Sequence, residues 1–274
     1  MLDKILHKTL NLPYRLFLRT IQKSEKPRAT VILLHGLAST NQLWNNLRLE
    51  IPVDADILAV DLLGHGNSPK PSWEGAQTLK SQARALRRAL RTSGHLSRPI
   101  FLVGHSLGSL VSAEFAKLYP SSVDFVVMVS PPIYLQNSKS EYAWSRESFL
   151  KENYQYLVEN QDFASKIAKI ATEKVIRGAS QIKTDQDLHL LAETLDLSIL
   201  QQDTFQTLEN TTTKTQIIYG LFDPLVISKN IKKLEELNTN ISTTAIPTAH
   251  DVSDITANVI VRSINENLTR SKND

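Results

Sequence analysis

The stretch FLVGHSLGSL, residues 101–110, places Ser106 between two glycines directly after a short apolar run. The apolar residues 100–103 have the length of a buried strand, and residues 107–120 have the apolar spacing of a helix. A serine on a sharp strand-to-helix turn presents its hydroxyl at the carboxyl end of a sheet, where it can act as a nucleophile. A glycine-rich turn without chemistry is the alternative, and the strand–turn–helix setting favours the nucleophile.

Short apolar runs elsewhere in the chain predict the other strands. The clear ones are residues 30–36, 56–61, 125–130 and 215–220, a weaker one is 241–247, and the alternating residues 13–22 predict an edge strand. Helical patterns separate several of these runs, for example over residues 75–92. Strands that alternate with helices predict an α/β fold with a mostly parallel sheet covered on both faces.

The alternation stops after residue 132. Residues 133–208 contain helical patterns and no convincing strand, and a strand pattern returns at 215. We therefore predict a core made of residues 1–132 and 209–274, with residues 133–208 inserted as a helical cap.

A serine hydroxyl needs a base, and the expected chain order after this turn is serine, acid, histidine. Only His189 and His250 follow Ser106. His189 falls inside the predicted helical insertion, whereas His250 lies in a loop after the last predicted strand. The sequence therefore favours His250 as the base.

The acid is predicted to be Asp223, in the loop directly after the strand at 215–220. A buried carboxylate there would accept the imidazole Nδ1 proton and hold the ring in one tautomer. An Asp before a proline can also simply begin a helix. The loop after the preceding strand reads Ser130-Pro131-Pro132 and has no carboxylate, and we assign Asp251 to the cap of the final helix.

Two backbone N–H groups are needed to stabilise an oxyanion. One is expected from Leu107, directly after the serine, and the other from Leu37, in the loop after the strand at 30–36. Gly36 lets that loop turn tightly, and we interpret His35 as a residue that structures the loop.

These motifs together resemble the α/β-hydrolase superfamily, in its esterase and aminopeptidase-like branch with a helical cap. The resemblance rests on LLHGLAST, DLLGHGNS, VGHSLGS, YGLFDP and TAHDV, which occur in the family's order across nearly the whole core. It implies that Asp61 and Gly64 hold structure, so neither Asp61 nor His65 is counted as catalytic. Ala249 departs from the glycine that often precedes the family's histidine.

The resemblance also narrows the reaction, because superfamily members that hydrolyse epoxides or haloalkanes have aspartate where this chain has Ser106. Acyl transfer remains, with hydrolysis of small to medium uncharged carboxylic esters first and thioester, amide or carbon–carbon hydrolysis as alternatives. A ligand receptor with little turnover is a further alternative of a different class. No cofactor or metal is expected.

The pocket is expected between Leu37, Leu107 and the insertion. Its candidate aromatic lining residues, each of which could instead pack lid against core, are Trp44, Tyr134, Tyr142, Trp144, Phe149, Tyr154 and Tyr156.

Composition limits the partners of the 274-residue chain. The net charge of +3 demands no nucleic acid, and no apolar run is long enough to span a membrane. The chain has no cysteine, and with no signal-peptide pattern a cytoplasmic location is expected. A short helix near the start of the chain is expected to dock on the protein's own body through one apolar face, formed by Leu2, Ile5, Leu6 and Leu10. The basic residues between 80 and 91 are expected to form a solvated helix face.

Overall fold

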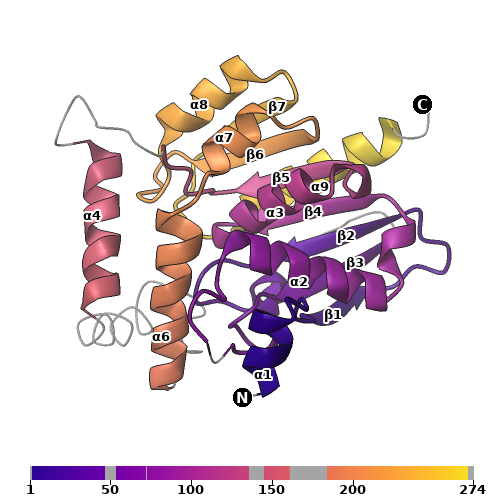
Figure 1. Ribbon diagram of the computed structural model, residues 1–274. Helices are drawn as coiled ribbons and strands as arrows, with labels where there is room; N and C mark the ends of the chain where they lie inside the picture. The colour runs from indigo at the N-terminus through magenta and orange to yellow at the C-terminus, as the bar shows by residue number, and fades with distance from the viewer. Residues whose placement is uncertain (1, 47–53, 72, 136–144, 161–183, 271–274) are drawn as a thin grey trace.

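A computed structural model describes residues 2–46, 54–71, 73–135, 145–160 and 184–270. Its described residues contain one sheet of seven strands in the order β1-β3-β2-β4-β5-β6-β7. The strands are β1 (Phe17–Gln22), β2 (Ala29–Leu34), β3 (Ala55–Asp61), β4 (Ile100–His105), β5 (Phe125–Val129), β6 (Lys214–Gly220) and β7 (Ile241–Ile246). Only β1 runs antiparallel to its neighbour, so the prediction of a mostly parallel α/β sheet is confirmed (Figure 1).

Continuous apolar runs became central strands because both faces of this sheet are covered. Every residue of β2, β3, β4 and β5 is buried, whereas the edge strand β1 is exposed or half-buried along its length. Alternate residues of β4 divide between two core clusters, with Leu102 in one and Phe101 in the other. This pattern is the one expected of parallel strands buried on both sides.

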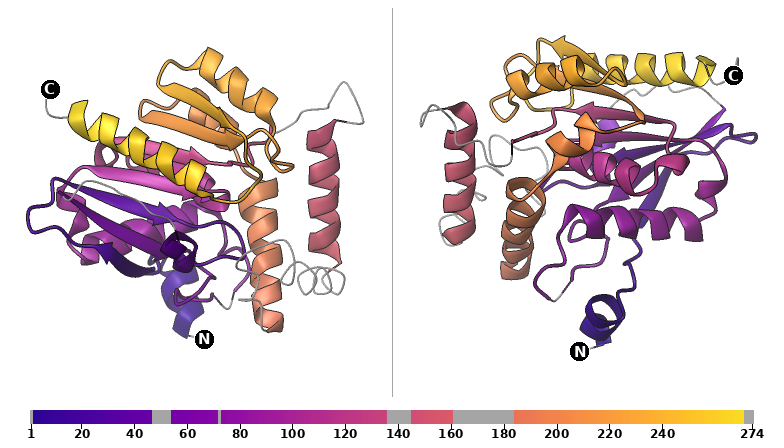
Figure 2. Two further views of the ribbon diagram at one scale, coloured as in Figure 1. Left: turned by 180° about the vertical axis from the view of Figure 1, so that it is seen from behind. Right: turned by 45° about the horizontal axis from the view of Figure 1, so that its top comes forward.

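More helices cover one face of the sheet than the other. The cluster that contains Leu102 also includes residues from α2 (Leu79–Thr92), α3 (Leu107–Leu118), α7 (Thr204–Glu209) and α8 (Ser228–Leu237). The cluster that contains Phe101 includes Ile260 and Ile264 of α9 (Asp254–Arg270), which lies on the opposite face (Figure 2). Short 3₁₀ turns occur at η2 (Asn41–Asn46), η3 (His95–Ser97) and η4 (Pro120–Ser122).

The described residues of the inserted region are mostly helical. It contains α4 (Arg146–Glu159), α6 (Asp185–Thr194) and a π-helical turn η6 (Leu195–Leu200), and no strand occurs among the described residues of 133–208. In Figure 1, α4 and α6 stand beside the sheet at the end where the parallel strands finish. The later helix α7 instead packs between α3 and α8, with Phe205 and Leu208 buried in the core. The division into core and cap remains a prediction.

The start of the chain does not dock as expected. Its helical turns, α1 (Leu2–Lys4) and the π-helical η1 (Ile5–Thr9), leave Leu2 69% and Leu10 59% exposed. Polar and aromatic contacts hold this segment, with the Tyr14 hydroxyl donating to Asp3 at 2.9 Å and the His7 ring stacked on Tyr14. The expectation that its apolar face packs on the protein's own body is therefore wrong. Across the residues that can be placed, no helix is long and apolar enough to cross a membrane.

Candidate active site

Ser106 occupies a strained turn between β4 and α3. Its backbone has φ 52° and ψ −117°, a left-handed conformation that a residue with a side chain rarely adopts. Its N–H donates to the carbonyl of Val129 at 2.9 Å, which ties the turn to the end of β5. A Cβ on Gly104 would lie 2.3 Å from the Gly108 carbonyl oxygen, so the strand and helix approach too closely for any larger residue.

Asp223 and His250 meet at the same edge of the sheet. The His250 Nδ1–H donates to the Asp223 carboxylate, with 2.8 Å between nitrogen and Oδ2. The Asp223 side chain is fully buried, whereas 24% of the His250 side chain is exposed. The pair lies in the loops that follow β6 and β7, and Ser106 lies directly after β4, so parallel topology collects all three at the carboxyl edge.

Gly220, the last residue of β6, brings those two loops together. A Cβ there would lie 2.3 Å from the carbonyl oxygen of Thr248 and 2.7 Å from that of Ala249. The Phe222 N–H also donates to the Thr248 carbonyl at 3.1 Å. The loop that carries His250 can therefore pass directly over the end of the strand that precedes Asp223.

Asp223 is held in its charged form. Burial raises the pKa of its carboxyl group, but the hydrogen bond and charge of His250, together with hydrogen bonds from neighbouring groups, outweigh burial, and the net pKa lies below the ordinary value. The Leu225 N–H donates to the other carboxylate oxygen at 2.9 Å and lowers the pKa further. Arg146, the first residue of α4, donates to the main-chain carbonyl of Asp223 at 2.6 Å and so links the insertion to this loop.

The two expected oxyanion donors have N–H groups available. Within the described part of the chain, the Leu37 N–H donates no hydrogen bond, and Leu107 is the first residue of α3, whose N–H has no partner inside the helix. A Cβ on Gly36 would lie 3.1 Å from the Ser106 Cβ, so the loop that carries Leu37 runs close beside the serine. This placement is compatible with two donors that face one reacting oxygen.

Buried histidines and Asp61 build the loops around these donors. The His35 Nε2 accepts from the Leu62 N–H at 3.0 Å, and the His65 Nε2 accepts from the Ala38 N–H at 3.3 Å. Burial lowers the pKa of both imidazoles, so both are neutral. Asp61 is fully buried and accepts from the N–H of Asn41 at 2.6 Å and of Asn67 at 2.8 Å. These contacts are structural.

His105, the residue before the serine, contacts the proposed base. Its Nε2–H donates to the main-chain carbonyl of His250 at 2.7 Å, which places the proton on Nε2. Its buried Nδ1 has no hydrogen-bond partner among the described residues. Burial, with a further contribution from His250, lowers the pKa of His105 to about 3. Sequence reasoning gave this residue no role, and its position directly before Ser106 was the available signal.

Several other candidates do not join this group. His189 is exposed on α6, and Trp44 is 2% exposed within the core cluster that contains Ile260. Tyr134 is buried, and its hydroxyl donates to the Leu225 carbonyl at 3.3 Å. Its ring centre lies 6.4 Å from that of the partly buried Tyr154. Phe149 and Tyr156 are exposed. Tyr142 and Trp144 lie outside the described residues.

Asp251 does not cap the final helix. Helix α9 begins at Asp254, and the Ser253 hydroxyl accepts from the Thr256 N–H at 3.4 Å. Ser253 therefore performs the role that we assigned to Asp251, because it lies directly before the first helical residue.

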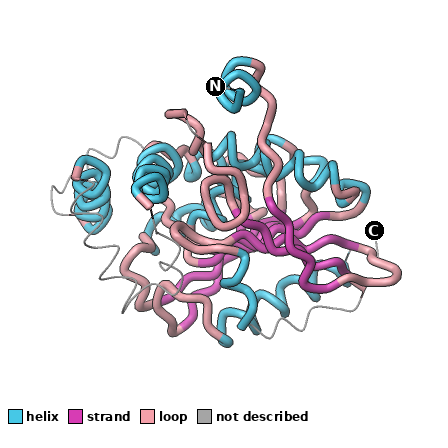
Figure 3. Tube along the Cα trace, turned by 90° about the horizontal axis from the view of Figure 1, so that it is seen from below, coloured by secondary structure: helices cyan, strands magenta, loops and turns pink. Residues whose placement is uncertain are grey.

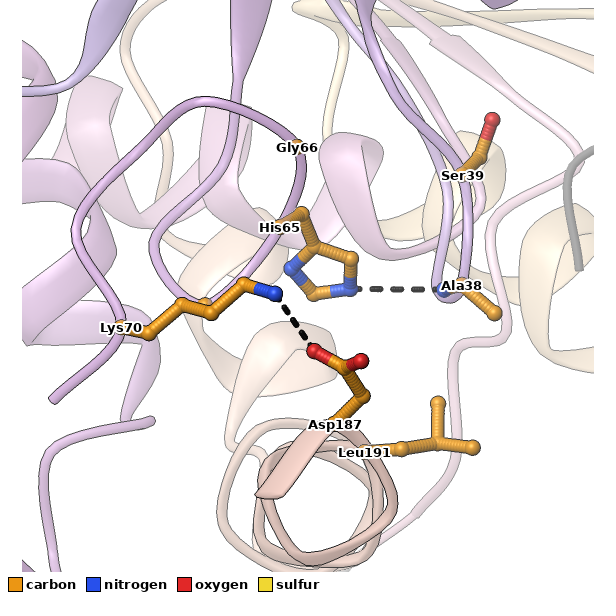
Figure 4. A pocket seen from close by; sticks show the side chains of 8 residues that line it. Ala38, Ser39, His65, Gly66, Lys70, Asp187 and Leu191 are labelled. Atoms are coloured by element: carbon orange, nitrogen blue, oxygen red, sulfur yellow. Dashed lines mark hydrogen bonds and ion pairs between the residues drawn. The ribbon is translucent and has the colours of Figure 1, made fainter. Parts of the chain in front are cut away.

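A small pocket opens beside the Leu37 loop (Figure 4). Ala38 and Ser39 line one side, the loop after β3 with His65 lines another, and Asp187 of α6 forms an ion pair with Lys70 across it. The insertion therefore meets the core next to the candidate oxyanion donors. No group of three or more His, Cys, Asp or Glu side chains able to hold a metal occurs among the residues with defined positions.

Comparisons with known proteins agree with this fold. A sequence profile of the protein family with the alpha/beta hydrolase fold matches residues 29–254. Lipase LipV of Mycobacterium tuberculosis is 33% identical over 111 residues, which make up 40% of each chain. The probable lysophospholipase BODYGUARD 1 of Arabidopsis thaliana is 30% identical over 125 residues, 43% of this chain and 26% of its own. The matches thus span less than half the length of these relatives.

Solved structures with low sequence identity share the whole fold. A hydrolase from Oleispira antarctica has a TM-score of 0.73 at 17% identity and covers 92% of this chain and 95% of its own. An esterase from Exiguobacterium antarcticum has a TM-score of 0.72 at 15% identity and covers 91% of this chain and 95% of its own.

Proposed function

The chain belongs to the α/β-hydrolase fold family, and from that membership we propose that it is a serine hydrolase of small to medium uncharged carboxylic esters. Ser106 is the proposed nucleophile, His250 the base and Asp223 the acid. The observation that carries the proposal is the 2.8 Å contact between His250 and Asp223, at the same sheet edge as the strained Ser106 turn. The relatives named as a lipase and a probable lysophospholipase favour ester bonds over other acyl bonds.

The proposed reaction proceeds through an acyl-enzyme. His250 Nε2 takes the proton from Ser106 as Oγ attacks the ester carbonyl, and Asp223 stabilises the imidazolium through the Nδ1–H bond. The N–H groups of Leu37 and Leu107 stabilise the tetrahedral oxyanion. The alcohol then leaves with the proton from His250, and water, activated by the same base, hydrolyses the acyl-serine.

An apolar setting supports the preference for uncharged substrates. Leu107 is fully buried, and Leu37 packs against the larger core cluster. A charged group bound against these two leucines would lose its hydration without gaining a partner from them, which is costly. Thioesters, amides and carbon–carbon bonds remain the alternative substrates for the same three residues.

Replacement of the nucleophile tests the proposal. We expect Ser106→Ala to fold normally and to lose on the order of 10⁶ in kcat, because a triad without its serine has no acceptor for the acyl group. Activated nitrophenyl esters give the rate, and a fluorophosphonate probe followed by peptide mapping identifies the reactive residue.

Labelling at a residue other than Ser106, or an alanine variant that keeps most of its activity, would overturn the assignment. Labelling at Ser106 without repeated turnover on esters, thioesters or aminoacyl amides would favour the receptor alternative.

The inserted helices are proposed to set the size limit of the substrate. We expect Tyr142→Ala and Trp144→Ala to shift the preferred acyl chain length more than they change the rate on an acetate ester, because removal of an aromatic side chain enlarges the apolar pocket. The measurement is kcat/KM over a series of nitrophenyl esters, with the exposed Phe149→Ala as the matched control on α4. Identical chain-length profiles in all variants would exclude a lining role for Tyr142 and Trp144.

A further inference from the structure

The beginning of the chain presents an apolar surface that its own fold leaves uncovered. Within segment 2–12, Leu2 is 69%, Ile5 45%, Leu10 59% and Leu12 44% exposed. Leu2 and Ile5 are three residues apart in a helical stretch and so share one side of it. Six of the twelve large apolar side chains that are exposed in the described residues lie between positions 2 and 21. Single exposed leucines are ordinary, but a concentration of them marks an interaction surface.

The segment is held in a defined position while these side chains face outward. Arg84 of α2 donates to the Asn11 side chain at 2.6 Å and to the Asn11 carbonyl at 2.9 Å. The His7 ring stacks on Tyr14, and its Nδ1–H donates a hydrogen bond to the Leu12 carbonyl at 2.6 Å. The Lys8 ammonium lies 5.5 Å from the Trp73 ring centre. Figures 2 and 3 show the segment standing out from the body beyond α2. The backbone of the segment therefore projects from the body, and it carries the exposed apolar side chains named above.

Positive charge is concentrated around the same segment. Segment 2–12 contains Lys4, Lys8 and one acid, Asp3, and the adjacent helix α2 contains five Lys and Arg and no acid. These two regions carry a formal charge of +6 in a chain whose net charge is +3, so the remainder of the chain is negative. The segment and the helix beside it are therefore more basic than the rest of the chain.

We propose that segment 2–12 and the basic face of α2 bind the surface of an anionic phospholipid bilayer. Leu2, Ile5, Leu10 and Leu12 enter the boundary between headgroups and acyl chains, while Lys4 and the exposed Lys80 and Arg91 of α2 meet anionic headgroups. A second protein copy fits less well, because two copies joined through this surface would bring two strongly basic regions together. The binding does not depend on the proposed ester hydrolysis.

Vesicle co-sedimentation of the full chain with a C-terminal tag tests the proposal. The Ser106→Ala variant keeps lipid hydrolysis out of the measurement. We expect binding to phosphatidylcholine vesicles that contain phosphatidylglycerol and little binding to pure phosphatidylcholine, with a decrease at high salt. Lys4→Glu should weaken binding by about fivefold or more, and Leu2→Ser with Leu10→Ser by about tenfold or more.

The matched control is the double variant Lys232→Glu with Leu237→Ser on α8, which changes an exposed base and an exposed leucine elsewhere on the surface and should bind like the parent. Circular dichroism and the melting temperature check that each variant folds. Equal binding to both vesicle types, no binding to either, or unchanged binding by the double leucine variant would each overturn the proposal. So would light scattering that shows a dimer abolished by the leucine changes without vesicle binding.

Discussion

At the scale of single residues, the contact between His105 and His250 is the feature with the clearest consequence. The residue before the proposed nucleophile holds the backbone of the proposed base through one partly buried hydrogen bond of 2.7 Å. Because the Asp223 carboxylate holds the same histidine through its side chain at 2.8 Å, His250 is positioned from two directions. His105 touches no reacting atom in the proposed mechanism and is therefore a positioning residue.

Two amide substitutions separate this role from packing. The Gln side chain can place its amide nitrogen near the position of the imidazole Nε2, whereas the shorter Asn side chain reaches only the position of Nδ1. We expect His105→Gln to keep kcat within about threefold, and His105→Asn to lower kcat about tenfold with little change in KM, which is the typical cost of one buried hydrogen bond. Steady-state kinetics and the rate of Ser106 labelling measure the difference. Equal losses in both variants would contradict a positioning role.

At the scale of elements, the loops after β6 and β7 depend on a contact between two backbones. Gly220 is the last residue of β6, and the Thr248 carbonyl lies directly against it. A Cβ at position 220 would lie 2.3 Å from that carbonyl oxygen, so the oxygen would have to move away. Because Asp223 follows three residues later and His250 two residues after Thr248, the same contact sets the distance between the proposed acid and the proposed base.

We expect Gly220→Ala to lower kcat by about 10² or more, because a shift of about 1 Å in a catalytic group has that effect. The free energy of unfolding should fall by about 1–3 kcal/mol from the overpacked contact. Gly94→Ala is the control: Gly94 has φ 77°, no atom lies within 4 Å of its Cβ position, and it lies far from the carboxyl edge, between α2 and β4. The Gly94→Ala substitution should lower the free energy of unfolding by about 1 kcal/mol and leave kcat unchanged. An active Gly220→Ala enzyme would show that the two loops can separate without consequence.

At the scale of the whole molecule, several histidines are buried in their neutral form. His35, His65 and His105 each have a pKa below the ordinary value because burial penalises the imidazolium. In the unfolded chain each of these imidazoles takes up a proton as the pH falls through about 6.5, whereas in the folded chain it stays neutral at that pH. The folded state is therefore favoured above that pH, and the stability contribution is lost progressively as the pH falls below it.

The slope of stability against pH provides the test. Between about pH 6.5 and the folded pKa of His105, about 3, this residue alone should lower the free energy of unfolding by about 1.4 kcal/mol per pH unit. Urea unfolding from about pH 7.5 to 5 should thus give a steeper decline for the natural chain than for His105→Gln, which removes one such proton. Identical slopes would mean that His105 is charged, or titrates equally, in both states.

Most of the fold was predictable from local patterns. The fully buried strands, such as β2 and β4, are continuous apolar runs. β1 lies at the sheet edge as predicted, but the burial of its residues does not alternate. Ser106 and the loops of Asp223 and His250 could be selected because loops that follow parallel strands collect at one edge. These inferences need only the order of elements along the chain. The roles of the three residues stay proposals for the experiments above.

Close approaches between distant segments were decided only by the tertiary structure. The His105 contact joins residues 145 positions apart, and the Gly220 contact brings two loops into van der Waals range. Likewise, the apolar pattern of residues 2–10 predicted a docked helix, but Tyr14 and α2 hold the segment through polar groups and leave Leu2, Ile5 and Leu10 exposed. Local sequence patterns specify which residues are apolar and which element they form. They carry no information on which surfaces meet, because that depends on the packing of all the elements together.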